Sequence, residues 1–215
     1  MDQRLLEVKA RLGELCRPHD QREARIGVAA PEIIARATDC DLVIMGTHSR
    51  TGLAHLFLGS VAEAVVRSST APVITVPLAA HPKLPHLILV ATDFSPSARR
   101  ALEYARLLAS ATGAELAIVH VLDEGRRESQ ENAYNLLTQL AHDLSDRRRL
   151  VVGGKPALEI LELATDLHAD LIAIGTHGRT GLARLIFGSV AEPVVRHSLV
   201  PVLTAREVPD STPRH

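Results

Sequence analysis

The chain has 215 residues, a formal net charge of -1 at pH 7, and a composition that is 46% hydrophobic but only 2% aromatic. The length allows one large domain or two modest ones, and it is enough to bury a real core. The balanced charge excludes the basic excess that draws a protein onto nucleic acid or anionic lipid, and the few aromatics exclude the stacking platforms of single-strand binders. Val, Ile, Leu and Ala must build the core, as in parallel sheets covered by helices.

The sequence favours a cytoplasmic location for the protein. Its two cysteines, Cys16 and Cys40, lie in unrelated contexts and offer neither a disulfide framework nor a metal-ligand spacing. The N-terminus has no apolar signal core, and no apolar run approaches the ~20 residues of a membrane span. We therefore expect a cytoplasmic protein without a membrane partner.

The first half of the chain opens with an expected helix at about residues 2–16. Residues 32–39, EIIARATD, follow, and they parallel EILELATD at 159–166. The next segment, 46–75, reads GTHSRTGLAHLFLGSVAEAVVRSSTAPVIT. It recurs at 175–204 as GTHGRTGLARLIFGSVAEPVVRHSLVPVLT, with 21 of 30 positions identical. The chain therefore holds two copies of one domain.

After a proline-bearing linker at 78–85, strands alternate with helices. Ser95 is the expected N-cap of one helix, with Pro96 at its first position and Gly113 beyond its end. Arg147–Arg149, at the end of a polar helix, are expected to be solvated. We expect strands at 87–91, 115–122, 150–152, 170–175 and 201–204, and helices at 96–112, 128–146, 156–168 and 189–197. This alternation predicts right-handed β-α-β units and one parallel sheet.

The first copy is shorter than the second. Residues 1–77 contain no counterpart of the second copy's first two strands or of the helix between them, whereas residues 86–206 form a complete copy and 207–215 a tail. A parallel sheet that lacks two central strands leaves backbone groups unpaired and an apolar face bare. We therefore expect the first copy to lean on the second domain, on a partner chain or on a rearranged sheet.

A long glycine-rich loop follows the expected strand at 170–175. Residues 175–189 fit the pattern G-x2-G-x9-G-S and lead into a helix. Glycine allows close backbone approach to a phosphate-bearing ligand, and the free N–H groups at a helix start favour an anion. Open α/β sheets place their ligands at this end of the strands. No P-loop pattern ending in Gly-Lys-Ser/Thr is present, which argues against a motor or switch ATPase.

The same serine has a simpler interpretation. Ser189-Val-Ala-Glu192 matches a capping box, and so does Ser60-Val-Ala-Glu63. In this alternative Ser189 satisfies only its own helix and the glycines are turn residues, although both roles can coexist. Pro193 stands where the first copy has Ala64, and we expect it to shift the helix start because proline has no N–H to donate.

Three separated motifs together resemble the universal stress protein family: Ala91-Thr-Asp-Phe-Ser95, His120-Val121 and the glycine pattern. The resemblance covers residues 86–206 in full and 1–77 in part. It implies an open, doubly wound five-stranded parallel sheet of order 3-2-1-4-5, here one complete copy plus one partial copy. Members often pair as dimers through the last strand, and those with this glycine pattern bind ATP.

The resemblance, carried over position by position, implies one nucleotide site in the second copy. Asp93 would lie at the adenosine end, near the ribose or a metal ion such as Mg²⁺. Ala91 and Val121 would line the adenine slot, and Ile174, at the end of the strand before the loop, belongs to the same set.

At the other end, Gly175 and Gly178 would shape the loop, and Arg179 would add charge to a phosphate or remain solvated. The residues implied to hold the phosphates are Gly188, Ser189 and Val190. In the first copy Ser49 replaces the second glycine and the Asp-bearing strand is missing. We therefore predict that the first copy does not bind nucleotide by itself.

These features lead us to expect an ATP-binding regulatory protein of the stress response, acting as a homodimer. No catalytic residue and no set of metal ligands can be assigned. We interpret His48 and His177 as polar loop residues. Any ATP hydrolysis should be slow, because no base or arginine finger is evident. The alternatives are a scaffold that binds no nucleotide and acts through dimer surfaces, and an adenylating type of enzyme, which would need a catalytic residue not found here.

Overall fold

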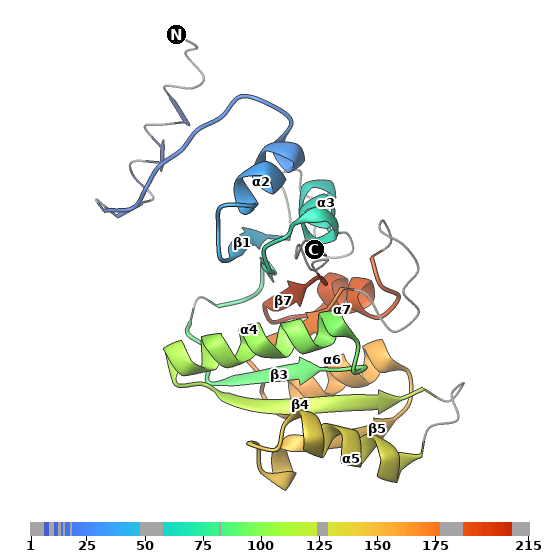
Figure 1. The fold of residues 1–215 in the computed structure, drawn as a ribbon. Coiled ribbons are helices and arrows are strands. Elements are labelled where there is room, and N and C mark those ends of the chain that lie inside the picture. The colour runs from blue at the N-terminus through green and yellow to red at the C-terminus, as the bar shows by residue number, and fades with distance from the viewer. Residues whose placement is uncertain are drawn as a thin grey trace, which may run out of the picture.

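The computed structural model describes residues 19–47, 58–81, 83–123, 129–176 and 187–207, together with residues 7, 8, 11, 12, 14, 16 and 17. Its centre is one seven-stranded sheet with helices on both faces (Figure 1). The second half supplies five parallel strands in the order β5-β4-β3-β6-β7. Their bounds are β3 Leu87–Ala91, β4 Glu115–Leu122, β5 Arg149–Gly153, β6 Leu171–Gly175 and β7 Val202–Ala205. The predicted order 3-2-1-4-5 is confirmed for these five strands, but the prediction of a five-stranded, wholly parallel sheet is wrong, because two strands of the first copy extend the sheet and one of them pairs antiparallel.

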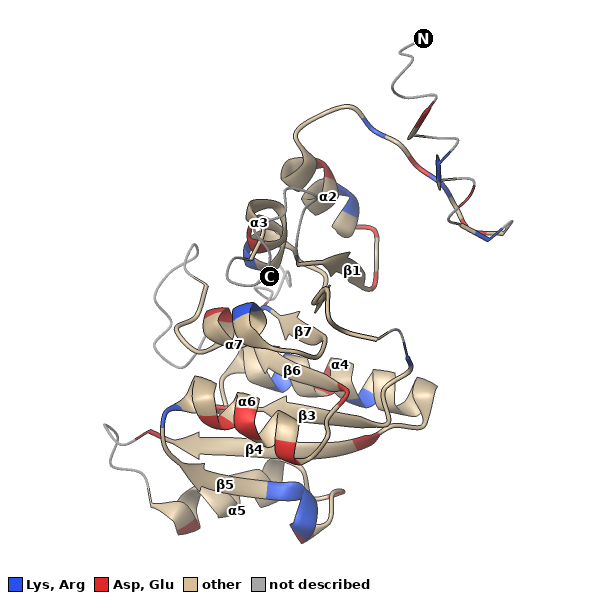
Figure 2. Ribbon diagram, turned by 180° about the vertical axis from the view of Figure 1, so that it is seen from behind, with Lys and Arg blue, Asp and Glu red and all other residues tan. Residues whose placement is uncertain are grey.

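Helices cover both faces of these strands. On one face lie α4 (Pro96–Thr112) and α5 (Gln130–Leu140); on the other lie α6 (Pro156–Asp166) and α7 (Ala191–His197). Successive residues of a strand point to opposite faces, so Leu89 packs in one core and its neighbours Ile88 and Val90 in the other. Burial on both faces explains the continuous aliphatic runs in the sequence. These central strands carry almost no charge (Figure 2).

The start and end of α4 follow the expected local chemistry. The Ser95 side chain accepts a hydrogen bond from the Ala98 N–H, Pro96 is the first helical residue, and Gly113 takes a left-handed conformation with φ 79°. A residue without Cβ adopts that conformation freely, which ends the helix.

The predicted polar helix at 128–146 is too long. It ends at Leu140, and a short 3-10 helix, η1 (Asp146–Arg148), precedes β5. Arg106 donates to the Leu140 carbonyl (3.4 Å) and Arg149 to the Ala141 carbonyl (3.2 Å), so guanidinium groups satisfy the last carbonyls. The expectation that Arg149 is solvated is wrong, since its side chain is only 8% exposed.

The first copy joins the sheet of the second domain. It contributes α2 (Ala29–Ala37), β1 (Val43–Gly46), α3 (Ser60–Ser68) and β2 (Val73–Val76). β1 and β2 pair in parallel, and β2 pairs antiparallel with β7, so the shorter copy leans on the second domain. The edge of β7, through which the resemblance predicts dimers, is therefore occupied within the chain.

This antiparallel pair is nearly two-fold symmetric. Ile74 lies opposite Leu203, and these two residues are equivalent in the repeat. The Thr75 hydroxyl donates to the Val202 carbonyl (3.3 Å), and the Thr204 hydroxyl donates to the Val73 carbonyl (3.1 Å). Each copy thus makes the same bond to the other.

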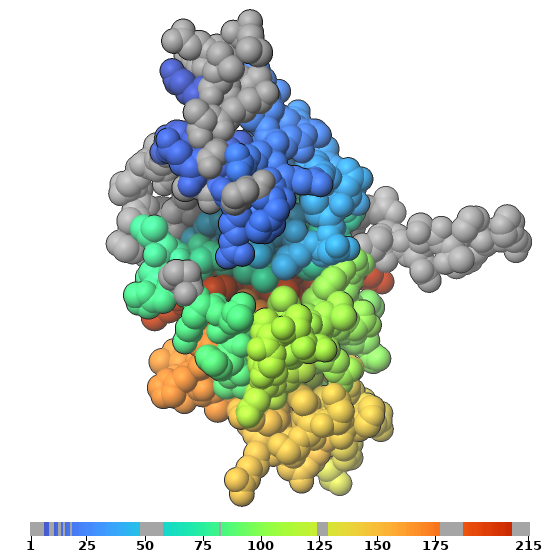
Figure 3. Space-filling model, turned by 90° about the vertical axis from the view of Figure 1, so that its left-hand side faces the viewer, coloured from blue at the N-terminus to red at the C-terminus, as the bar shows by residue number. Residues whose placement is uncertain are grey.

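Within the described residues, the edge and one face of β1 are left uncovered, as expected. Among the described strands, β1 pairs with β2 alone. Ile44 is 65% exposed, whereas the equivalent Ala173 in β6 is fully buried beneath α4. The first copy has no counterpart of α4 to cover this position. In the space-filling view the described part of the first copy runs from blue to blue-green and lies above α4 (Figure 3).

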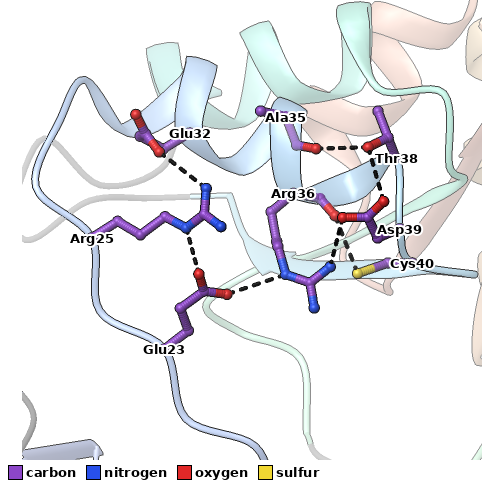
Figure 4. Close-up of polar contacts among 8 residues, drawn as sticks. All are labelled: Glu23, Arg25, Glu32, Ala35, Arg36, Thr38, Asp39 and Cys40. Carbon is purple, nitrogen blue, oxygen red and sulfur yellow. Dashed lines mark hydrogen bonds and ion pairs between the residues drawn. The ribbon is translucent and has the colours of Figure 1, made fainter.

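A chain of ion pairs attaches the segment before α2 to that helix (Figure 4). Glu23 bonds to Arg25 (2.5 Å) and Arg36 (3.1 Å), and Arg25 reaches Glu32 (3.4 Å). The hydrogen bond from Arg25 is the largest influence on the Glu23 carboxyl group, and it lowers the pKa of that group. Aligned through Glu32 and Glu159, residues 22–26 correspond to β5, which pairs with β4. The first copy lacks that partner strand, and the segment forms no strand.

Candidate functional site

Three adjacent strands bring the residues expected at the adenine slot together. β3 lies between β4 and β6, with Ala91 opposite Val119 on one side and Ile174 on the other. Ala91, Val121 and Ile174 are buried in the same core cluster, on the face that α6 and α7 cover. Because parallel strands end at the same edge, this is the edge where such sheets place ligands.

Asp93 lies in the tight turn that joins β3 to α4. Its Oδ1 accepts a hydrogen bond from the Ser95 N–H (3.1 Å), and the Phe94 N–H donates to Thr92 Oγ1 (3.0 Å). Phe94 has a φ of +64°, in the left-handed region that side chains disfavour. Side-chain bonds thus hold Asp93 at the carboxyl end of the central strand.

His120 lies beside this turn and is a residue to which the sequence assigned no role. Its Nδ1 lies 2.7 Å from the Thr92 carbonyl oxygen, and its ring centroid lies 4.7 Å from that of Phe94. The residue is 5% exposed. A histidine inside a run of aliphatic strand residues is the signal that could have identified it.

Gly175 allows α4 to approach the end of β6. A Cβ atom there would lie 2.6 Å from both the Ala98 nitrogen and Ser97 Oγ, closer than packed atoms allow. At the equivalent Gly46, a Cβ would meet no atom of the described residues within 4 Å. The structure thus requires a glycine at position 175 for helix packing.

The two ends of the glycine-rich loop are tied together. The Gly188 N–H donates to the Thr176 carbonyl (2.9 Å), and the Thr176 N–H donates to the Ala205 carbonyl (2.9 Å). The first copy repeats the closure with Gly59 and Thr47 (2.8 Å). Gly178 and Arg179 lie outside the described residues.

The capping boxes expected at both helix starts are wrong. α3 has Gly59 as its N-cap and α7 has Val190, and neither makes a side-chain cap bond. Ser60 is already helical, whereas α7 begins at Ala191, two residues later than the repeat would place it. This shift agrees with the expected effect of Pro193, which cannot donate to the Ser189 carbonyl.

The described residues contain no cluster of potential metal ligands and no membrane-spanning helix. In these ranges, no group of three or more His, Cys, Asp and Glu side chains is placed to hold a metal ion. His48 and His177 lie outside them, so their interpretation stays a prediction. No helix in the same ranges is long and apolar enough to cross a bilayer.

The sequence matches a known family along most of its length. The profile of the universal stress protein family matches residues 3–77 and 86–206. A universal stress protein of Mycobacterium tuberculosis is 30% identical over 202 residues, covering 84% of this chain and 63% of that protein. One of Methanocaldococcus jannaschii is 28% identical over 151 residues, covering 55% and 93%. The chain therefore spans less than two thirds of the mycobacterial relative.

Solved structures show the same fold. A universal stress protein from Archaeoglobus fulgidus has a TM-score of 0.66 at 30% identity, covering 82% of this chain and 66% of that one. The Methanocaldococcus jannaschii protein has a TM-score of 0.54 at 29% identity, covering 60% and 100%. Two other universal stress proteins were solved in complex with cAMP and with dAMP, at TM-scores of 0.46 and 0.45.

Proposed function

Because the chain belongs to the universal stress protein family, we propose that its second domain binds an adenine nucleotide, ATP, and acts as a regulatory protein of the stress response. One observation carries the proposal. Ala91, Val121 and Ile174 share one face at the ends of three adjacent strands, beside the Asp93 turn and the closed ends of the glycine-rich loop.

The adenosine part of the nucleotide would occupy the strand ends. The ends of these strands would line the base through backbone groups and small side chains, while the Asp93 carboxylate would supply an acceptor for ribose hydroxyls or a ligand for Mg²⁺. Asp93 Oδ1 already accepts one bond from Ser95, which fixes the carboxylate in place. A carboxylate has further lone pairs for a ligand.

The phosphates would lie against the start of α7 and the loop before it. The Gly188 N–H is engaged by Thr176, so the role of Gly188 there is to let the chain pass close to the ligand. Within the described residues, the N–H groups of Ser189 and Val190 have no carbonyl partner, and they would donate to phosphate oxygens. Gly178 would give the loop its close approach, and Arg179 would add positive charge.

The arrangement fits binding better than rapid turnover. The Ser95 hydroxyl caps α4, so it is not set up as a nucleophile. We propose at most a slow ATPase, with nucleotide occupancy changing which partner the protein binds.

We divide the chain into a partial domain (1–77), a linker (78–85), a complete domain (86–206) and a tail, and propose one nucleotide site per chain. The first copy retains Gly46, Gly59 and Ser60 but lacks the strands that carry Asp93 and Val121. A cytoplasmic homodimer fits the family. Since β2 occupies the edge of β7, two chains would have to meet through another surface.

The repeat provides a matched pair of variants to test the site. In Gly188→Glu a carboxylate enters the phosphate end of the second copy, whereas Gly59→Glu makes the same change in the first copy. We expect calorimetric titration with ATP to show binding in the wild type and in Gly59→Glu, and a large loss of affinity in Gly188→Glu.

Circular dichroism of both variants controls for folding. If Gly188→Glu is folded and keeps wild-type affinity, the loop is not the phosphate site. If the wild type gives no heat at millimolar ATP and releases no nucleotide on denaturation, the scaffold alternative is favoured.

A further inference from the structure

The turn after β3 contains a conformation that needs support from its surroundings. Phe94 lies at φ +64°, which a residue with a Cβ adopts only when neighbouring contacts stabilise it. Asp93 immediately precedes it and is held by the Ser95 N–H. Whatever stabilises Phe94 therefore also fixes the position of Asp93.

His120 makes two contacts with this turn from the neighbouring strand β4. Its Nδ1 lies 2.7 Å from the Thr92 carbonyl oxygen, and its ring packs against the Phe94 ring at 4.7 Å with the planes inclined by 40°. The ring is almost fully buried, so water cannot easily replace either contact. A hydrogen bond and a ring contact thus act on both residues that flank Asp93.

We propose that His120 is a positioning residue of the nucleotide site: its imidazole, with the proton on Nδ1, holds the Thr92 carbonyl and the Phe94 ring and so fixes the turn that carries Asp93. The inference rests on the proposed function for its effect on nucleotide, but the contacts exist in the protein without ligand. A carbonyl oxygen has no proton to give, so Nδ1 must be the donor.

The tautomer of His120 gives a first test that needs no substitution. Nitrogen-15 NMR of the imidazole at pH 8 distinguishes a ring protonated on Nδ1 from one protonated on Nε2. We expect the Nδ1–H form to predominate in the protein without nucleotide. A ring protonated mainly on Nε2 would overturn the proposal, because that ring cannot donate to Thr92.

Two substitutions separate the hydrogen bond from simple packing. His120→Asn places an amide N–H close to the position of Nδ1, whereas His120→Leu fills a similar space without a donor. The amide protons of Phe94 and Ser95, which bond to the side chains of Thr92 and Asp93, report directly on the turn. In the Leu variant we expect both amides to exchange about tenfold faster, as the loss of one hydrogen bond from a local structure predicts.

Titration with ATP then connects the turn to the site. We expect affinity to fall about tenfold in His120→Leu and to stay within about threefold of wild type in His120→Asn. Equal exchange rates in the Leu variant and the wild type would overturn the positioning role. Faster exchange with unchanged ATP affinity would overturn its relevance to the nucleotide.

The results that would refute ATP binding differ from those that would refute the role of His120. If no form of the protein binds ATP, but the Nδ1–H tautomer and the exchange pattern are as expected, the nucleotide assignment is wrong and His120 still fixes the turn. If His120→Leu does not fold, two measurements still test the positioning role of His120: the tautomer in the wild type, and the ATP affinity of His120→Asn.

Discussion

Gly175→Ala tests how closely α4 packs against the end of β6. A Cβ at position 175 would lie 2.6 Å from the Ala98 nitrogen and 2.7 Å from the Ser97 carbonyl carbon. Both are backbone atoms, so the start of α4 must move away. Overpacking of this kind costs about 1–3 kcal/mol. The smaller entropy of alanine in the unfolded chain offsets about 0.4–1 kcal/mol of this cost.

Gly46→Ala is the matched control, because no atom in the described part of the chain lies within 4 Å of a Cβ at that position. We expect it to raise stability by about 0.4–1 kcal/mol, through the unfolded chain alone. Gly175→Ala should lower stability by about 1.3 kcal/mol net, from the middle of each range. For a chain of this size, that lowers the thermal midpoint by about 3–5 °C.

Thermal unfolding followed by circular dichroism measures both variants under the same conditions. The Gly175→Ala variant should also bind ATP more weakly, because the displaced start of α4 carries the turn with Asp93. If both alanine variants have the same midpoint, the close approach of α4 to β6 is not what requires glycine.

Two further predictions concern the linker and the bare face. Asp170, only 9% exposed, accepts bonds from Lys83, His86 and Leu87, whereas the equivalent Asp41 is exposed. Burial acts to raise the pKa of Asp170, but these three donors outweigh it and lower the pKa. Asp170→Ala should cost about 1–3 kcal/mol at pH 7 and Asp41→Ala under about 0.5. A depressed pKa stabilises the fold above the ordinary aspartate value, so in urea unfolding the cost of Asp170→Ala should shrink as the pH falls below about 4; a cost that stays constant would contradict this. Ile44→Thr should change stability by less than about 0.5 kcal/mol, and a larger loss would show that Ile44 is covered.

Local sequence signals were sufficient for much of the second domain. β3, α4 and β4 have the bounds predicted for them. Their strands are uninterrupted aliphatic runs, and α4 carries a capping serine, a proline at its first position and a terminal glycine. Each of these signals acts within a few residues, so it can be read from the sequence alone.

Contacts between distant residues explain what the sequence could not predict. The end of α5 depends on Arg106 and Arg149, which come from other elements. The partner of the first copy depends on the pairing of β2 with β7, and no local pattern selects this among the three possibilities. The capping box at Ser60 failed by one residue, because Gly59 takes the extended conformation of the N-cap.

Part of the candidate site could also be predicted from the sequence, and part of it could not. The motif predicted Asp93 and the aliphatic residues as members of the site, and the strand order brings them to the same edge of the sheet. The contacts of His120 were missed because its partners, Thr92 and Phe94, lie in the turn after the neighbouring strand β3, far from His120 in the sequence. Engagement of the Gly188 amide by Thr176 was also not predictable, since it depends on how the loop closes.

The stoichiometry of ATP binding tests the central claim most directly. Nucleotide-free protein would be titrated with ATP by calorimetry, and the number of molecules bound per chain determined. We expect one ATP per chain, because only the second domain has both the strand ends and the loop. Two ATP molecules per chain would show that the first copy forms a site, and no binding at millimolar ATP would contradict the nucleotide assignment.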